Sequence, residues 1–145
     1  MAHNLASLDT LVRGFPDPVH DAQVSFRVLL DALARPGRIR SIDVALDDDV
    51  NRRWPAAAFA AVLTLADFST PVWLQQPDEA LAQAIRFHTG APLVDESREA
   101  AFGYILDPAK MPSLDGFSHG TPEAPQHSAT LLPTVTEPPA ARRLP

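Results

Sequence analysis

The feature that most constrains the fold is a regular alternation of helix-type and strand-type segments in the middle of the chain. Its members are a helix over 55–68 (PAAAFAAVLTLADF), a strand over 70–74 (TPVWL), a helix over 79–89 (EALAQAIRFHT) and a strand over 91–94 (APLV). Pro55 suits the first position of a helix that is apolar on most sides. Asp78 can cap the second helix, and Gly90 can close it. This alternation favours an α/β fold in which helices are layered on a mixed sheet.

Flanking segments extend the alternation in both directions. Asp21 is a suitable N-cap for a helix over 22–35, which Pro36 and Gly37 end. Further strands are predicted over 38–46, 100–106 and 129–136. Pro133 lacks the N–H group that a strand ladder needs, so the last strand is predicted at an edge of the sheet.

The first of these helices carries apolar residues at the spacing i, i+3, i+4 and i+7. They are Phe26, Leu29, Leu30 and Leu33. This spacing predicts that they form one buried helix face. Asp31 and Arg35 make an i, i+4 ion pair on the same helix, which leaves Arg27 without a helical partner.

The length of 145 residues indicates a single domain over residues 1–145. Residues 1–20 are expected to form an N-terminal arm. Seven of the 15 prolines lie from Pro112 onward. This enrichment predicts that residues 107–128 form a proline-rich loop.

Composition excludes several classes of function. The net charge of −6 argues against general nucleic-acid binding, which relies on a basic surface. No run of 18 apolar residues is present, so no membrane-spanning helix is expected. The absence of cysteine excludes disulfides, thiol catalysis and cysteine-ligated metals, and it fits a cytoplasmic protein.

The stretch RFHTGAP, residues 86–92, is the most distinctive cluster of polar groups. His88 continues the helix face of Leu81, Ala84 and Ile85, so its ring is expected to be buried or half-buried and bonded to a backbone carbonyl. The alternative makes it a donor to a phosphate or to a partner subunit. Arg86 lies two residues earlier, roughly on the opposite side of the helix, so the two side chains do not converge.

The position of this cluster also argues against a phosphate loop. It lies at the C-terminal end of a helix, where the helix dipole favours cations, whereas phosphate loops use the N-terminal end. We therefore predict no catalytic, cofactor-binding or metal-binding residue. The candidates for a phosphate or partner contact are Arg27, Arg86, His88 and Thr89.

Other constellations carry a weaker signal. Asp47 to Asp49 lack the remaining ligands of a calcium loop and are interpreted as a solvated turn. His119, His127 and Glu123 could in principle bind a metal, but their spacing matches no standard site.

Four longer stretches, taken together, resemble a known family. They are DAQVSFRVLLDALARPG, VLTLADFSTPVWL, IRFHTGAPLV and GTPEAPQHSATLL, and the resemblance runs from about residue 15 to about residue 135. Their order and spacing are similar to those of the H subunit of the bacterial carbon–phosphorus lyase complex.

The resemblance implies a function in phosphonate catabolism. The complex exchanges the adenine of ATP for a phosphonate and gives a ribose 1-phosphonate 5-triphosphate. The H subunit would belong to a core assembly with the G, I and J subunits, in a mainly structural role. Homodimers also occur in the family. The alternative is a module that binds the nucleotide or phosphonate directly.

The resemblance also implies a fold like that of pyridoxal-phosphate-dependent transferases, without the cofactor. The single lysine, Lys110, lies in a loop-like segment, which does not favour a Schiff base. Family members run longer than this chain. The C-terminal part of the family fold is therefore expected to be missing here.

Overall fold

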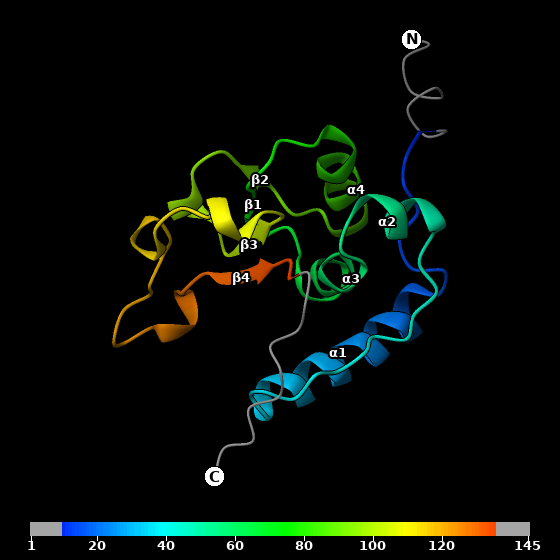
Figure 1. The fold of residues 1–145 in the computed structure, drawn as a ribbon, viewed down its shortest axis with the longest axis horizontal. Coiled ribbons are helices and arrows are strands. Elements are labelled where there is room, and N and C mark those ends of the chain that lie inside the picture. Colours follow the sequence, from blue (N-terminus) through cyan, green and yellow to red (C-terminus); the bar gives the residue numbers. More distant parts are fainter. Residues whose placement is uncertain (1–9, 136–145) are drawn as a thin grey trace.

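The computed structural model describes residues 10–135 as an open α/β arrangement (Figure 1). Four α-helices and four strands follow one another in the order α1, α2, α3, β1, α4, β2, β3, β4. Their bounds are α1 Pro18–Ala34, α2 Asp48–Arg53, α3 Ala56–Leu65, β1 Val72–Leu74, α4 Glu79–Thr89, β2 Leu93–Val94, β3 Phe102–Ile105 and β4 Thr130–Pro133. The α/β class is therefore confirmed.

The sheet has the strand order β2-β1-β3-β4, and each neighbouring pair is parallel. The prediction of a mixed sheet was wrong, because every link between successive strands returns the chain to the same end of the sheet before the next strand begins. Pro133 lies in β4 at one edge of the sheet, as predicted. Its missing N–H costs no bond there, since Thr130 and Thr134 donate to the neighbouring strand.

The core lies between the sheet and the helices α3 and α4. α3 is alanine-rich and buries Phe59, Ala60, Ala61 and Val62. α4 buries Leu81, Ala82, Ala84 and Ile85. Val72 and Tyr104 from the sheet join the same cluster. The predicted strands over 70–74, 91–94 and 100–106 are present in shortened form as β1, β2 and β3.

α4 matches its prediction in both bounds and caps. The Asp78 side chain accepts a hydrogen bond from the Leu81 N–H at 3.0 Å. Gly90 ends the helix in the left-handed region with φ 73°, and its N–H bonds to the Arg86 carbonyl. Asp78 also accepts a bond from the Trp54 indole at 2.8 Å, so one carboxylate both starts α4 and anchors the end of α2.

The first helix begins earlier than predicted. Asp17 is its N-cap, with its side chain accepting from the His20 N–H at 3.2 Å, and Pro18 opens the first turn. The prediction of Asp21 as the cap was wrong because a proline is tolerated at the first helical position, where no N–H is needed. Residues 18–20 therefore belong to α1 and not to an N-terminal arm.

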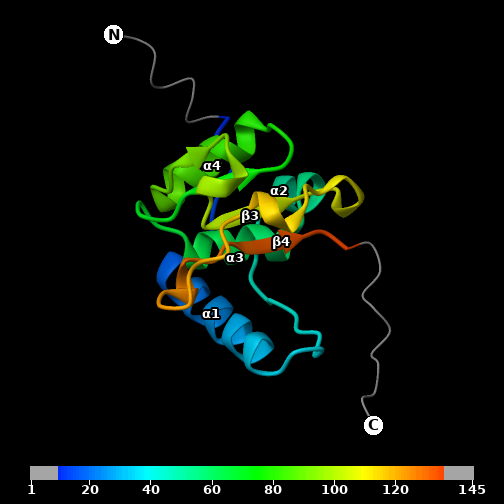
Figure 2. The same ribbon diagram turned by 90° about the vertical axis from the view of Figure 1, so that its left-hand side faces the viewer.

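The predicted buried face of this helix was also wrong at three of its four residues, and only Leu29 is half-buried. Phe26, Leu30 and Leu33 are 48%, 55% and 75% exposed. The helix instead turns its small residues inward, and Ser25 is fully buried. α1 crosses and packs against α3 at the periphery of the molecule (Figures 1 and 2).

Two further segments differ from the sequence-based expectation. Residues 38–46 form no strand and run as an extended connection from α1 to α2. Asp47 is a helix N-cap that accepts from the Asp49 N–H, and Asp48 opens α2, so the expected solvated turn is a short helix. The segment 107–128 contains three single 3-10 turns, Pro108–Lys110, Leu114–Gly116 and Pro125–His127.

Candidate functional site

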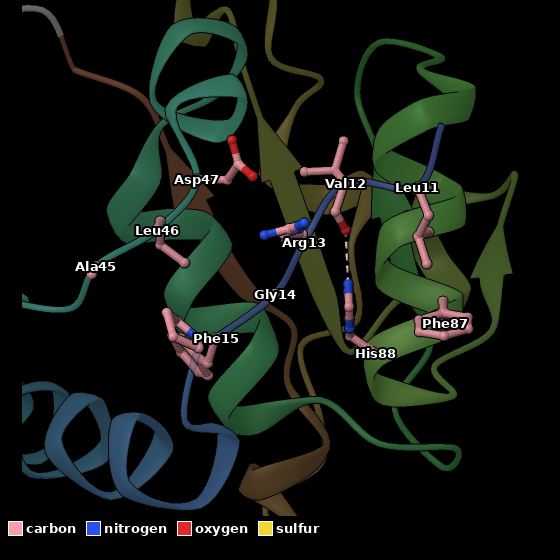
Figure 3. Close-up of a pocket in the computed structure, with 11 residues that line it drawn as sticks. Leu11, Val12, Arg13, Gly14, Phe15, Ala45, Leu46, Asp47, Phe87 and His88 are labelled. Carbon is pink, nitrogen blue, oxygen red and sulfur yellow. Dashed lines mark hydrogen bonds between the residues drawn. The ribbon is translucent and has the colours of Figure 1, made fainter. Parts of the chain in front are cut away.

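A hollow lies between the N-terminal segment, the start of α2 and the end of α4. Its volume is about 760 Å³. His88, Arg13 and Asp47 contribute the ionisable side chains (Figure 3). We call it the His88 hollow.

His88 uses one ring nitrogen to fasten the N-terminal segment to α4. Nε2 lies 2.8 Å from the carbonyl oxygen of Val12. Because a carbonyl can only accept, Nε2 must carry the proton and donate it. Val12 itself is buried, with 6% of its surface exposed. The predicted bond to a backbone carbonyl is confirmed, but the ring is exposed and not buried.

Gly14 permits this contact. A Cβ atom at this position would lie 3.0–3.2 Å from the His88 ring, which is closer than ordinary packing allows. His88 therefore holds the N-terminal segment on α4: its Nε2 bonds to Val12, and its ring lies against the backbone of Gly14. A phosphate could take the Nε2 proton only by displacing the Val12 carbonyl.

Arg86 lies in a second hollow at the carboxyl ends of β1 and β2. This strand-end hollow has a volume of about 650 Å³. The Arg86 guanidinium is 3.3 Å from Glu79, and Asp78 and Asp95 line the same space. The carboxylates outnumber the cation, so the hollow does not favour a phosphate. Arg86 and His88 face different hollows, as the helix geometry predicted.

Parallel α/β sheets commonly bind ligands at the carboxyl ends of neighbouring strands, at the point where the strand order reverses. In this sheet that point lies between β1 and β3. Gln75 fills it with its own side chain. Its amide nitrogen donates to the Asp107 carbonyl at 2.7 Å, and its amide oxygen accepts from the Asp107 N–H at 2.7 Å. The usual ligand position is thus closed by a side chain of the protein.

Thr89 and Arg27 complete the set of predicted residues. The Thr89 hydroxyl donates to the Ile85 carbonyl at 2.7 Å and accepts from the Ala91 N–H at 3.0 Å, so it stabilises the end of α4. Arg27 lies on α1, exposed, beside Phe26. The structure does not bring Arg27, Arg86 and His88 into one site.

The hydroxyl of buried Tyr104 has the most strongly shifted pKa among the described residues. Burial, with the charge of nearby Asp78, raises the pKa of its hydroxyl well above the usual range. The hydroxyl donates to the Pro55 carbonyl at 3.2 Å. Since Pro55 is the N-cap residue of α3, this hydrogen bond attaches the start of α3 to β3, and we assign the Tyr104 hydroxyl a structural role.

Metal ligation finds no support in residues 10–135. No group of three or more His, Asp or Glu side chains there could hold a metal ion. The His119 ring bonds to the Leu114 carbonyl at 3.0 Å. No helix among the same residues is long and apolar enough to cross a membrane.

Sequence reasoning missed the most distinctive surface, which is the exposed side of α1. Val19, Phe26, Leu30 and Leu33 are all largely exposed along it. The spacing of these residues gave the signal, but it was interpreted as a buried face. The small residues Ser25 and Ala32, on another side of the helix, indicated which side could approach another helix closely.

Comparison with known proteins gives two matches. The profile of a family described as "Bacterial phosphonate metabolism protein (PhnH)" matches residues 13–143. A protein of Rhizobium meliloti (strain 1021), "Alpha-D-ribose 1-methylphosphonate 5-triphosphate synthase subunit PhnH", is 39% identical over 127 residues. The alignment covers 83% of this chain, and the chain spans about 60% of the length of that relative.

Proposed function

Because the chain belongs to the PhnH family of bacterial phosphonate metabolism proteins, we propose that it serves as a subunit of a synthase that makes ribose 1-methylphosphonate 5-triphosphate. The observation that carries the proposal is the family match over residues 13–143, supported by a relative named as a subunit of that synthase. The other core subunits of the complex would be its partners, in the cytoplasm.

We propose that the role of this subunit is mainly structural. The support is the use that the chain makes of its own polar groups. His88 tethers the N-terminal segment, Thr89 ends α4, and Gln75 closes the strand-end position. The His88 hollow and the strand-end hollow both hold carboxylates as well as cations, Asp47 in the first and Glu79 in the second. An anionic substrate would meet repulsion as well as attraction there.

The proposal includes a single domain, self-association as a homodimer, and kinship with the fold of pyridoxal-phosphate-dependent transferases without the cofactor. The parallel sheet flanked by helices is compatible with such kinship. These three points stay predictions.

Co-purification tests the role in a complex. The chain is expressed together with the other core subunits, with an affinity tag on one of those subunits. We expect it to elute in a fixed ratio with them through a size-exclusion column. Elution of the tagged assembly without this chain would overturn the proposal.

Calorimetry tests the alternative of direct ligand binding. ATP and methylphosphonate are titrated separately into the isolated chain at millimolar concentration. We expect no heat of binding. A saturable signal that Arg86→Ala or His88→Ala abolishes would replace the structural role by a ligand-binding one, with Glu79→Gln as the control that frees Arg86 from its ion pair.

A further inference from the structure

The exposed side of α1 has the pattern of a helix-pairing seam. Its members are Val19, Gln23, Phe26, Leu30 and Leu33, which we call the α1 seam. Their spacing of four, three, four and three residues is that of alternating d and a positions in a heptad repeat. All five are exposed. The seam runs about 21 Å along a 17-residue helix, given a rise of ~1.5 Å per residue.

The fold itself does not need this seam. α1 packs on α3 through a different side, on which Ser25 is fully buried and Val28, Leu29 and Ala32 are half-buried. The apolar residues of the seam therefore point away from the core of their own chain. A stripe of exposed Val, Phe and Leu on one helix marks an interaction surface.

We propose that the α1 seam pairs with the α1 seam of a second copy of this chain, in parallel and in register. The inference rests on the self-association in the proposed function and names the surface that performs it. In this arrangement each seam residue lies opposite its own copy, as a and d positions do in parallel two-stranded coiled coils.

Gln23 selects this arrangement. It is the only polar member of the α1 seam, at an a position. In register, the two Gln23 amides lie opposite each other, and each can donate to the oxygen of the other. An antiparallel pair would set Gln23 against Phe26 or Leu33 and leave a buried amide without a partner, which is costly. A single polar residue at an a position fixes register in this way.

Charge supports the same choice. Arg27 flanks the α1 seam at an e position, and within residues 10–135 it makes no ion pair or hydrogen bond. In a parallel pair an e position faces a g position of the partner helix, which here is Ala22. An antiparallel pair brings the e positions of the two helices together, so that His20 and Arg27 of both copies would share one flank.

The area of the α1 seam fits a dimer of ordinary size. The exposed parts of Val19, Phe26, Leu30 and Leu33 amount to roughly 450 Å². A standard interface buries about 800 Å² per partner, of which ~65% is apolar in homodimers, or roughly 500 Å². The α1 seam thus supplies most of the apolar share of one such interface.

Sedimentation velocity over a concentration series tests the surface. We expect the wild-type chain to dimerise and Leu30→Glu to weaken the dimer about a hundredfold, since both copies place a charge at a central apolar contact. Leu114→Glu is the matched control, because Leu114 is 57% exposed against 55% for Leu30 but lies in the segment 107–128. Circular dichroism checks that both variants remain folded.

A disulfide tests the register. The chain has no cysteine, so Leu30→Cys introduces a single thiol at the other a position and keeps Gln23. Under mild oxidation we expect a covalent dimer on a non-reducing gel, with Leu114→Cys not cross-linked at the same concentration. Failure of Leu30→Cys to cross-link in a chain that dimerises would overturn the parallel register.

The outcomes separate the two proposals. A wild-type chain that is monomeric at every concentration overturns self-association and this inference together, but leaves the subunit role to the co-purification result. A dimer that Leu30→Glu does not weaken overturns the surface alone. Loss of co-purification in Leu30→Glu with a monomeric wild type would assign the α1 seam to another subunit and overturn the second copy as its occupant.

Discussion

α1 and α4 are both amphipathic helices, yet the apolar stripe of one faces the core and that of the other faces solvent. Leu81, Ala84 and Ile85 of α4 are fully buried, whereas Leu30 and Leu33 of α1 are 55% and 75% exposed. Periodicity therefore shows that a helix has an apolar side but does not say what covers it. In α1 the side that contacts α3 carries buried Ser25 and half-buried Val28, Leu29 and Ala32, and its small residues let the two helices approach closely.

Truncation of the α4 core should have the largest effect. Ile85→Ala removes buried methyl and methylene groups and leaves a cavity between α4 and the sheet. We expect a loss of about 3 kcal/mol in the free energy of unfolding. Urea titration followed by circular dichroism measures it. A loss below ~1 kcal/mol would show that the apolar stripe of α4 is not packed in the core, contrary to the contrast drawn with α1.

Loss of the Asp78 carboxylate should rank second. Asp78→Ala removes the cap of α4 and leaves the indole N–H of buried Trp54 without its acceptor. We expect about 2 kcal/mol of destabilisation in the same urea assay. Asp78→Asn keeps one acceptor oxygen and serves as the milder control. Equal stability of the alanine variant and the wild type would contradict the role of this carboxylate.

High pH should destabilise the core through Tyr104. The folded chain holds its hydroxyl pKa well above the unfolded value of ~10, so the unfolded chain releases this proton first as the pH rises. The stabilisation is fully present below pH ~10, and stability then falls by about 1.4 kcal/mol per pH unit until the folded pKa is reached.

Absorbance at 295 nm reports this titration directly, because Tyr104 is the single tyrosine. We expect the folded chain to show no tyrosinate at pH 10.5, while the chain in urea is largely ionised. A Tyr104→Phe variant removes the signal and the excess pH dependence. Normal titration in the folded state would place the hydroxyl in contact with water.

Glycine replacement should show that a left-handed glycine is needed after both helices, as the cap of α4 and in the turn that follows the Arg35 cap of α1. Gly90 after α4 has φ 73° and Gly37 after α1 has φ 88°. An alanine strains the backbone at either position, so we expect about 1 kcal/mol of destabilisation for Gly90→Ala and for Gly37→Ala. Thermal unfolding compares them. A much larger cost at Gly90 would indicate that contact with Phe68 adds to the strain.

Truncation of the α1 seam should have the smallest effect on the monomer. Leu30→Ala removes side-chain atoms that are already half in water, so we expect a change within about 0.5 kcal/mol. Unfolding is followed at concentrations low enough to exclude dimers. A loss comparable to that of Ile85→Ala would mean that the stripe is covered within the chain, and the contrast between the two helices would disappear.

Local rules predicted α4 and β1 well because their signals lie within a few residues. A side-chain oxygen at Asp78 and a left-handed glycine at Gly90 fix both ends of a helix without tertiary information. The edge position of β4 likewise followed from the missing donor of Pro133. The parallel direction of the sheet and the orientation of α1 depend on contacts between distant segments, and no local pattern reports them.

The separation of Arg86 from His88 could be predicted from helix geometry alone. The acceptor of His88 could not, because Val12 lies 76 residues away in the chain. The choice between a buried and an exposed α1 stripe needed the position of α3. In each of these cases the missing information was which distant segment lies opposite.

The Gln75 side-chain amide takes the place of a backbone peptide group that pairs with a neighbouring strand, since it both donates to and accepts from the backbone of Asp107. Any molecule that enters the space between β1 and β3 must break both bonds and rotate this side chain. The side-chain amide protons of Gln75 therefore report on this space. Their NMR chemical shifts would change when a molecule occupies it and would not change when a molecule binds elsewhere.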